Sequence, residues 1–569
     1  MLEKLRLKLA EVDALPQFAL LGICGGLIAG AVITLFRLVI ETAQESFLPG
    51  ADPENYEALT LLWRFALPVL SGLCIGVLFQ MAKKESIQVG VVHVLERLAY
   101  YQGHLPWRNF VLQFIAAAVS IIGGQSVGRE GPGIHLGAAS SSFFGQALRL
   151  PNNSMRILVA CGAAASIAAS FNTPIAGVIF AMEVIVMEYT IAGFMPVILA
   201  TVSATVLMRV VFGDEPAFIL PPLKLGSLAE LPLVIVLGVI IGALAALFIF
   251  LLQASTKYTS KLPIWQKVTM AGVVTGLIAV PAPQIMGIGY DTVNMALLGQ
   301  IGLLTLGVIV LAKLVATGIG VGCGLPGGFI GPLFVIGAAG GGMMGAVAHW
   351  IFGAQASSAG FYAMIGMGAM MGATLQAPLA ALMALLELTV NTHIIVPGML
   401  AIVTAGISSS LLYNKQGVFL MLLRSKGLDY RNDPIAQSLR RVGVVSKMDR
   451  SFVRANRILE RAEAQNLLLK EPQWIVVEEE HKPVALLMSA DLLHFITAQQ
   501  QEEIDLLKIP GQRYDSQQIN MRATLQQALD LMNQKLVDAV YVGYADSAEN
   551  IVVHGILTRQ VIESYYRYK

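Results

Sequence analysis

Two segments of the chain repeat one pattern of small and apolar residues behind a Gly-Pro pair. GPGIHLGAASSSFFG (131–145) resembles GPLFVIGAAGGGMMG (331–345), 200 residues later. Further on, residues 162–184 resemble residues 366–388, and this match pairs Pro174 with Pro378. A duplication of this kind predicts two homologous halves with a binding site where they meet.

The duplicated part belongs to a membrane protein. The mean hydropathy is +0.68 and only 13% of the residues are charged. Apolar stretches recur up to about residue 413, but several are shorter than the roughly 20 residues of a full membrane span, and glycine or proline interrupts many. These features predict an all-α polytopic membrane protein with a repeat of broken helices. Whether the repeat is inverted or parallel depends on the number of crossings between the halves, and an inverted repeat of broken helices is the commoner outcome. Backbone exposed in such breaks is tolerated where it lines a cavity.

Charge separates this part from a tail. Residues 441–569 contain 32 of the 75 charged side chains. We therefore predict a transport domain over 1–430 and a linker over 431–444. A tail of two α/β modules, 445–497 and 512–569, follows, with a second linker over 498–511. Lys4, Arg6 and Lys8 near the N-terminus favour a cytoplasmic position for that end. The net charge of +1 argues against nucleic acid as a partner.

The two Gly-Pro pairs mark helix starts that suit an anion. Proline fits the first helical turn, so Pro132 and Pro332 predict two helix beginnings. Free amides and the helix dipole at such an end favour a negative ion. Glu130 precedes the first pair, and its carboxylate can accept the amides that an anion would use. A plain N-cap carboxylate at a membrane surface is the alternative reading.

The motifs GREGP (128–132) and GGFIGP (327–332), in this order with the duplicated helices, resemble the CLC family of chloride channels and proton-coupled chloride antiporters. The resemblance implies the CLC fold and a homodimer in the cell membrane, each subunit having its own anion pore. It implies that Glu130 is the external gate and that chloride or another small anion is the substrate, with protons as a possible second one. The implied anion-binding positions are Gly128, Arg129, Gly131, Val89, Gly90, Phe329, Ile330 and Phe419.

Three positions depart from the family pattern. Val89 and Phe419 stand where the family has a serine and a tyrosine, so two hydroxyl donors are missing and weaker or less selective halide binding is expected. Val184 stands at the internal proton-site position, where antiporters of the family have a second glutamate. This residue favours channel-like, passive conduction. An H⁺/Cl⁻ antiporter that uses another proton path, through water or Glu188, is the alternative.

Other polar residues of the core are interpreted as structural. Glu183 and Glu387 occupy matching repeat positions, and we expect them to serve helix ends. His135, His349 and His393 are expected to be packed or interfacial. The sequence contains no His-Glu-x-x-His motif and no paired-aspartate arrangement, so neither an enzyme nor a metal site is predicted.

The tail resembles a pair of CBS modules, which the family often has in the cytoplasm. Such pairs can bind adenine nucleotides, and Ser489 and Asp491 fit the pattern of their ribose contacts. Thr558 is the third possible nucleotide position, but Gln560 departs from the pattern, and a structural dimerisation tail is the alternative. A membrane-anchored CBS sensor is a further alternative for the whole chain, although it would not need the internal repeat.

Overall fold

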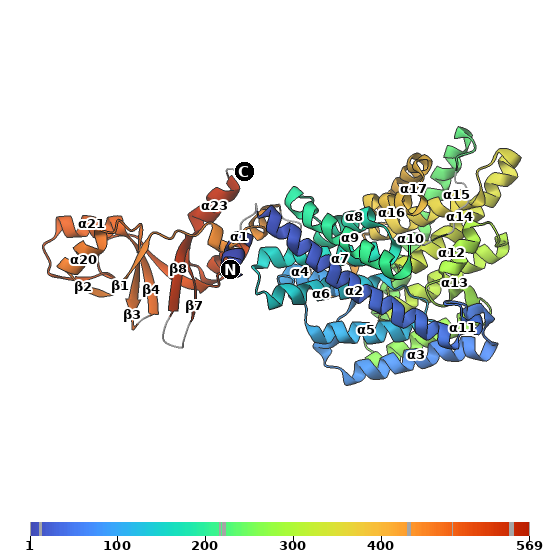
Figure 1. Cartoon of the computed structure of the whole chain (residues 1–569), viewed down its shortest axis with the longest axis horizontal. Helices are drawn as coiled ribbons and strands as arrows, with labels where there is room; N and C mark the ends of the chain where they lie inside the picture. The colour runs from blue at the N-terminus through green and yellow to red at the C-terminus, as the bar shows by residue number, and fades with distance from the viewer. Residues whose placement is uncertain are drawn as a thin grey trace. The chain divides into compact units, whose positions relative to one another are not determined.

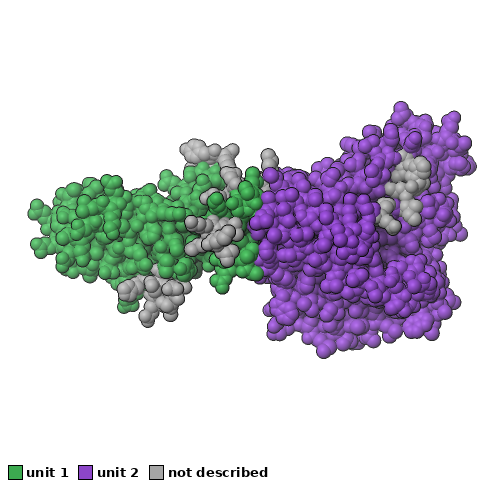
Figure 2. Space-filling view, in the orientation of Figure 1, with its two compact units in different colours: residues 1–18, 147–155, 431–569 green, residues 19–146, 156–430 purple. Residues whose placement is uncertain are grey.

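The protein was analysed as a computed structural model that describes residues 2–10, 14–214, 218, 224–428, 434–480, 482–545 and 551–567. The chain forms two compact units (Figure 2). Unit 1 contains residues 1–18, 147–155 and 431–569, and unit 2 contains residues 19–146 and 156–430. The predicted domain boundary at residue 430 falls within 429–433, outside the described residues.

Unit 2 is helical. Its first half contains α2 (Leu15–Phe47), α3 (Leu61–Met81), α4 (Gly90–Tyr100), α5 (Trp107–Ile122), α6 (Glu130–Ala147), α7 (Asn152–Phe171), α8 (Pro174–Phe180) and α9 (Ile191–Phe212). Its second half contains α10 (Leu231–Tyr258), α11 (Ile264–Ala279), α12 (Tyr290–Leu297), α13 (Leu303–Gly322), α14 (Ile330–Phe352), α15 (Ala359–Leu375), α16 (Pro378–Thr389), α17 (Ile395–Ile407) and α18 (Val418–Ser425). Eight helices in the described part of the chain are long and apolar enough to cross a membrane. Shorter apolar helices such as α5, α15 and α16 accompany them, as the broken stretches of the sequence predicted.

Glycines let the repeated helices pack at backbone distance. A Cβ added to Gly137 on α6 would lie 2.3 Å from the carbonyl oxygen of Gly162 on α7. The equivalent pair in the second half is Gly337 on α14 and Gly366 on α15, where the corresponding distance is 2.4 Å. Real Cβ atoms do not approach backbone so closely, so each crossing requires glycine. The two repeated helix pairs therefore meet at matching points, as the duplication predicted.

Two sets of reciprocal contacts place a local two-fold axis between the halves. Gly128 and Gly328 form an isolated antiparallel bridge, in which each amide donates to the other's carbonyl at 2.7 Å. From this bridge α6 and α14 run to opposite sides of unit 2 (Figure 1). Opposed helices about a two-fold axis are the arrangement that an inverted repeat produces.

The glutamates at the ends of α8 and α16 repeat this symmetry. The Glu183 carboxylate accepts the amides of Leu379 and Ala380 at 3.3 and 2.7 Å, in the first turn of α16. The Glu387 carboxylate accepts the amides of Ile175 and Ala176 at 2.9 and 2.6 Å, in the first turn of α8. Each half thus caps a helix of the other half, which is a helix-end role of the kind that the sequence predicted for both glutamates.

The tail part of unit 1 is a repeated α/β arrangement. Its six-stranded sheet has the order β1-β3-β4-β6-β7-β8, and a separate ladder pairs β2 with β5. The strands are β1 (Phe452–Asn456), β2 (Ile458–Glu460), β3 (Trp474–Glu479), β4 (Lys482–Met488), β5 (Glu503–Asp505), β6 (Arg513–Ile519), β7 (Ala539–Ala545) and β8 (Ile551–Thr558). The helices are α19 (Pro434–Arg440), α20 (Arg461–Leu468), α21 (Ser489–Ala498), α22 (Leu525–Lys535) and α23 (Arg559–Arg567). Strand, turn, strand and helix occur twice, in the order that the sequence predicted.

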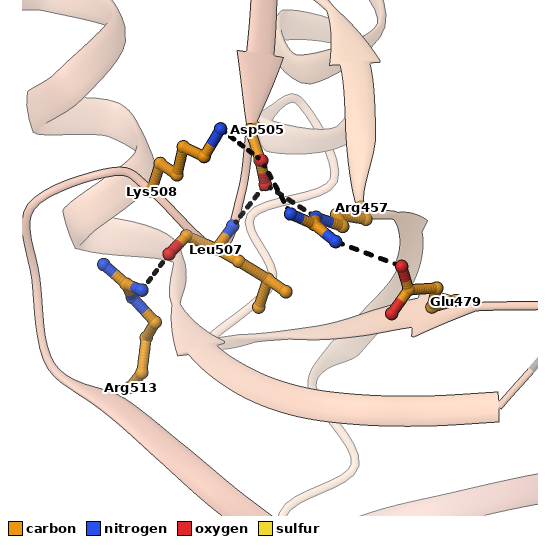
Figure 3. A network of polar contacts seen from close by, with 6 residues as sticks. All are labelled: Arg457, Glu479, Asp505, Leu507, Lys508 and Arg513. Carbon is orange, nitrogen blue, oxygen red and sulfur yellow. Dashed lines mark hydrogen bonds and ion pairs between the residues drawn. The ribbon is translucent and has the colours of Figure 1, made fainter.

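An ionic network holds the two-stranded ladder of the tail (Figure 3). The guanidinium of Arg457 donates to both carboxylate oxygens of Asp505, at 3.1 and 3.2 Å, and also to Glu479 at 3.1 Å. The hydrogen bonds from Arg457 hold the pKa of the Asp505 carboxyl below its usual range. The network therefore stabilises the ladder at neutral pH and loses that contribution when acid protonates Asp505.

Two segments that are distant in sequence join the tail within unit 1. They are the N-terminal helix α1 (Leu2–Leu9) and the connection between α6 and α7. The side chain of Asn153, in the first turn of α7, donates to the carbonyl of Leu9 at 2.9 Å, and the amide of Gly443 donates to the carbonyl of Ala10 at 3.0 Å. These hydrogen bonds to the carbonyls of Leu9 and Ala10 therefore hold the N-terminal segment within unit 1.

Candidate anion-binding site

The starts of α6 and α14 meet at the bridge between Gly128 and Gly328. A Cβ added to Gly131 would lie 2.7 Å from the Cα of Gly328, so a larger residue at this position would push the two helix starts apart. Both helices are long, with 18 and 23 residues, and each has its proline at the third position. Their free amides and dipoles therefore converge on one small region of the core.

Glu130 places its carboxylate on the amides of the opposite helix. The side chain is fully buried, and its Oε2 accepts the amide of Gly331 at 3.2 Å. The hydroxyl of Tyr290, the first residue of α12, donates to the other oxygen, Oε1. The carboxyl group of Glu130 thus lies at the start of α14, held from two sides.

A cavity of about 360 Å³, which we call the outer cavity, is bordered by Arg129, the residue before Glu130, and by Tyr290. Arg129 and Tyr290 line it, together with acidic residues such as Glu41 and Glu54. The guanidinium of Arg129 lies 3.1 Å from a carboxylate oxygen of Glu41 and 5.4 Å from the centre of the Tyr290 ring. Arg129 therefore contributes to the outer cavity, and it is not among the residues that line the inner one.

A second cavity of about 500 Å³, which we call the inner cavity, is bordered by Gly131, the residue after Glu130. Four separate segments of the chain contribute the residues that the family resemblance proposed for the anion. Those that line this cavity are Val89, Gly90, Gly131, Phe329, Ile330 and Phe419. Gly128 and Arg129 do not line it; Gly128 instead forms the bridge to Gly328. The predicted anion-binding residues therefore fall into three groups. Six of them line the inner cavity, Gly128 forms the bridge to Gly328, and Arg129 lines the outer cavity.

Backbone amides and apolar rings dominate the inner cavity. Val89 is the N-cap of α4 and has no side-chain hydrogen bond to cap it, and Gly90 follows with a φ of +80°. A Cβ added to Gly90 would meet nothing within 4 Å, so its backbone borders open space. The rings of Phe329 and Phe419 lie 5.2 Å apart. Since neither Val89 nor Phe419 has a hydroxyl, these two positions offer the anion no side-chain donor.

Val184 lies in apolar surroundings. It belongs to a turn of π-helix, Ala181–Val186, that continues α8, and it is buried in the hydrophobic core. Glu188, the residue that we considered as another proton carrier, lies 3.9 Å from the guanidinium of Arg156.

The three histidines divide into two groups. His135 is fully buried, and its Nε2 lies 2.9 Å from Nδ1 of His93. His349 and His393 are exposed. A buried pair and two exposed rings agree with the predicted packed or interfacial roles.

The three possible nucleotide positions of the tail do not share one cavity. Thr558 lines a cavity of about 310 Å³ together with Trp474, Tyr514 and Arg559, whereas Ser489 and Asp491 are not among its lining residues. Asp491 instead accepts the amide of Gln512 at 3.2 Å.

Sequence reasoning missed three polar residues of the core. Tyr290 could not be identified from the sequence, because a single tyrosine at the start of a short helix is not distinctive. Gln113 and Lys313 had a signal: they occupy matching repeat positions in apolar helices, where polar side chains are costly. Lys313 is fully buried, and its ammonium donates to the carbonyls of Ile285 and Gly287 at 3.0 and 2.9 Å.

Comparison with known proteins agrees with this architecture. Residues 71–410 match the family model described as voltage gated chloride channel. A ClcB-like protein of Ralstonia nicotianae is 30% identical over 403 residues, which cover 69% of this chain and 93% of the relative. The H⁺/Cl⁻ exchange transporter ClcA of Vibrio cholerae is 27% identical over 409 residues, covering 70% of this chain and 87% of the relative. The crystal structure of a slow cyanobacterial Cl⁻/H⁺ antiporter shares the fold, with a TM-score of 0.62 and 24% identity over 72% of this chain and 97% of the other.

Proposed function

Because the chain belongs to the voltage-gated chloride channel family, the CLC proteins, we propose that it conducts chloride passively between its outer and inner cavities under the control of Glu130. One contact supports this proposal above all: the carboxylate of Glu130 accepts the amide of Gly331 at the start of α14. In this position the side chain takes the place of a permeating anion. When the carboxyl is protonated it loses its charge and with it the attraction of the helix start, and the anion can replace it.

Passive conduction is proposed because the position of the internal proton glutamate is Val184. Valine cannot hold a proton, and the side chain is packed among other apolar residues. Proton-coupled exchange is the second candidate, since the ClcA relative is named an H⁺/Cl⁻ exchange transporter and the similar cyanobacterial structure a Cl⁻/H⁺ antiporter. An exchanger would need a proton path that avoids Val184, through water or Glu188.

The family resemblance supports three further proposals. The protein acts as a homodimer in the cell membrane, with its tail in the cytoplasm. The tail is a CBS pair that assists dimerisation. An adenine nucleotide is the alternative ligand of the tail: Thr558 lines a cavity there, whereas Ser489 and Asp491 are not among its lining residues.

The decisive experiment is chloride flux in liposomes with an imposed chloride gradient and a pH electrode. We expect chloride efflux that rises as the pH falls, without uphill movement of protons. Glu130→Gln should pass chloride at a rate independent of pH, because the side chain is neutral at every pH. Glu45→Gln, a change at an exposed residue near the end of α2, serves as the matched control and should keep the pH dependence.

Each other outcome has a definite meaning. Uphill proton movement driven by chloride would establish exchange in place of conduction. If the chloride flux of Glu130→Gln still depends on pH, Glu130 is not the gate. Folded protein that passes no chloride under any of these conditions would favour the membrane-anchored sensor.

A further inference from the structure

Gln113 is a buried amide at the wall of the inner cavity. It lies on α5, its side chain is 1% exposed, and it lines the cavity together with Val89, Gly90 and Phe329. Its Oε1 accepts the amide of Gly90 at 2.6 Å. Its Nε2 has no hydrogen-bond partner within the part of the chain that the structure describes. The residue therefore has one satisfied end and one unused donor.

The amide of Gly90 determines which end of Gln113 is free. A backbone N–H can only donate, so the side-chain atom that faces it must be the oxygen. The NH₂ group is consequently the unused end, and it cannot be exchanged with the oxygen without placing two donors against each other. A buried donor without an acceptor is rare in folded proteins, which indicates a partner that is not part of the chain.

The surroundings of this donor suit a negative partner. The cavity lies at the starts of α4 and α14, and it lacks the two hydroxyls that a serine at Val89 and a tyrosine at Phe419 would supply. Lys426 is the ionisable residue among those that line it, and its ammonium lies 3.9 Å from Glu96. The lining residues include no carboxylate, and no acceptor in the described part of the chain lies within hydrogen-bond distance of Nε2, so the acceptor would come from outside the chain.

The equivalent residue in the second half does not share the unpaired side-chain donor of Gln113. Lys313 is its repeat equivalent, and the ammonium of Lys313 already donates to the carbonyls of Ile285 and Gly287. The duplication therefore placed a buried polar side chain at both positions. One of them has its partners within the chain and the other has a donor left over.

We propose that Nε2 of Gln113 donates a hydrogen bond to the anion in the inner cavity, and that this amide replaces the hydroxyl donors missing at residues 89 and 419. The ligand class is a small monovalent inorganic anion, with chloride as the reference. The inference rests on the proposed function, because it assumes that the anion passes through this cavity. It also modifies the expectation of weak halide binding, since one side-chain donor is restored.

Two substitutions at Gln113 test the donor. Gln113→Met keeps the length of the side chain and removes both polar ends. Gln113→Glu keeps an acceptor for the amide of Gly90 but replaces the NH₂ group by an oxygen, which becomes an O–H donor only when the carboxyl is protonated. Both are made in the Glu130→Gln background, so that the gate does not titrate.

Thr201→Val is the control for the removal of a buried polar group away from both cavities. The hydroxyl of Thr201, on α9, donates to the carbonyl of Ile198 at 2.8 Å. Removing it should leave chloride affinity unchanged. Size-exclusion chromatography establishes that each variant is folded.

Chloride affinity is measured by calorimetry with potassium chloride at pH 7.5 and pH 5. We expect Gln113→Met to bind about ten-fold more weakly than the parent at both pH values, as the loss of a hydrogen bond to a charged group implies. Gln113→Glu should be weak at pH 7.5 and should regain affinity at pH 5. Since a carboxylate at this wall also repels an anion, the recovery of Gln113→Glu at pH 5 supports the donor only together with the loss of affinity in Gln113→Met.

The proposal is overturned if Gln113→Met binds chloride as tightly as the parent does, because Nε2 would then make no hydrogen bond to the anion. Gln113→Leu, which also lacks both polar ends and adds no charge, takes its place if Gln113→Met fails to fold. A parent protein that binds chloride and passes it normally, with unaffected Gln113 variants, would leave the proposed function intact. A parent that neither binds nor passes chloride would overturn both proposals.

Discussion

The two repeated halves begin their central helices in different ways. The first residue of α6 is Glu130, and the first residue of α14, its repeat equivalent, is Ile330. Each helix start has free amides, but only the first half adds a carboxylate, which then binds the amide of Gly331 in the second half. Duplication therefore supplies two matching helix starts, and under the proposed function a single acidic residue makes the site between them one that can be closed.

The largest effect is expected from separating the two helix starts. In Gly131→Ala the new Cβ would lie 2.7 Å from the Cα of Gly328, which is backbone and cannot turn aside. Overpacking of this kind costs about 1–3 kcal/mol or more and should abolish chloride flux. The measurements are thermal unfolding followed by size-exclusion chromatography, and flux in liposomes.

Gly133→Ala is the control for that change, because its Cβ would make ordinary contacts at 3.5 Å with Ile33 and 3.7 Å with Ser170. Equal behaviour of the two variants would show that close approach of α6 and α14 is not what builds the site.

An intermediate effect is expected from releasing the carboxylate of Glu130 on its outer side. Tyr290→Phe removes the hydroxyl that donates to Oε1 and leaves the ring in place. A hydrogen bond to a charged group contributes about 1.5–3 kcal/mol, so chloride flux at neutral pH should rise about ten-fold. Liposome flux measures it.

The matched control for the hydroxyl is Tyr362→Phe. Tyr362 donates to Glu230 at 2.7 Å, away from the residues of both cavities. Its flux at neutral pH should equal that of the wild type, and a rise of similar size in both variants would argue against a specific role of Tyr290.

The smallest effect is expected at the two glutamates that cap helices of the opposite half, where the two halves are symmetrical. Glu183→Gln and Glu387→Gln each weaken a carboxylate cap on a helix of the opposite half. Each should lower stability by about 1 kcal/mol and by a similar amount, without changing the pH dependence of flux. Thermal unfolding of the two variants side by side measures the difference. A strong change in proton movement for only one of them would show that this glutamate has a functional role beyond capping.

The sequence predicted the membrane region well because its signals are local or repeated. Pro132 and Pro332 identified two helix starts through the chemistry of a residue without an N–H. The duplication identified Glu183 and Glu387 as equivalents, and the alternation of strand and helix in the tail followed from periodicity and turns. The sequence could not reveal the hydrogen bond from Tyr290 to Glu130, since nothing in the residues around 290 indicates which distant side chain the hydroxyl reaches.

The sequence by itself determined that this chain spans a membrane many times, that it is duplicated, and that an acidic residue stands at one of two matching helix starts. These properties depend on composition and spacing, which a linear chain displays directly. Only the tertiary structure decided that Glu130 reaches the amide of Gly331, that Arg129 lies in the outer cavity, and that Gln113 has a donor left over. Contacts across about 200 residues depend on how helices pack, and packing is set by the whole fold.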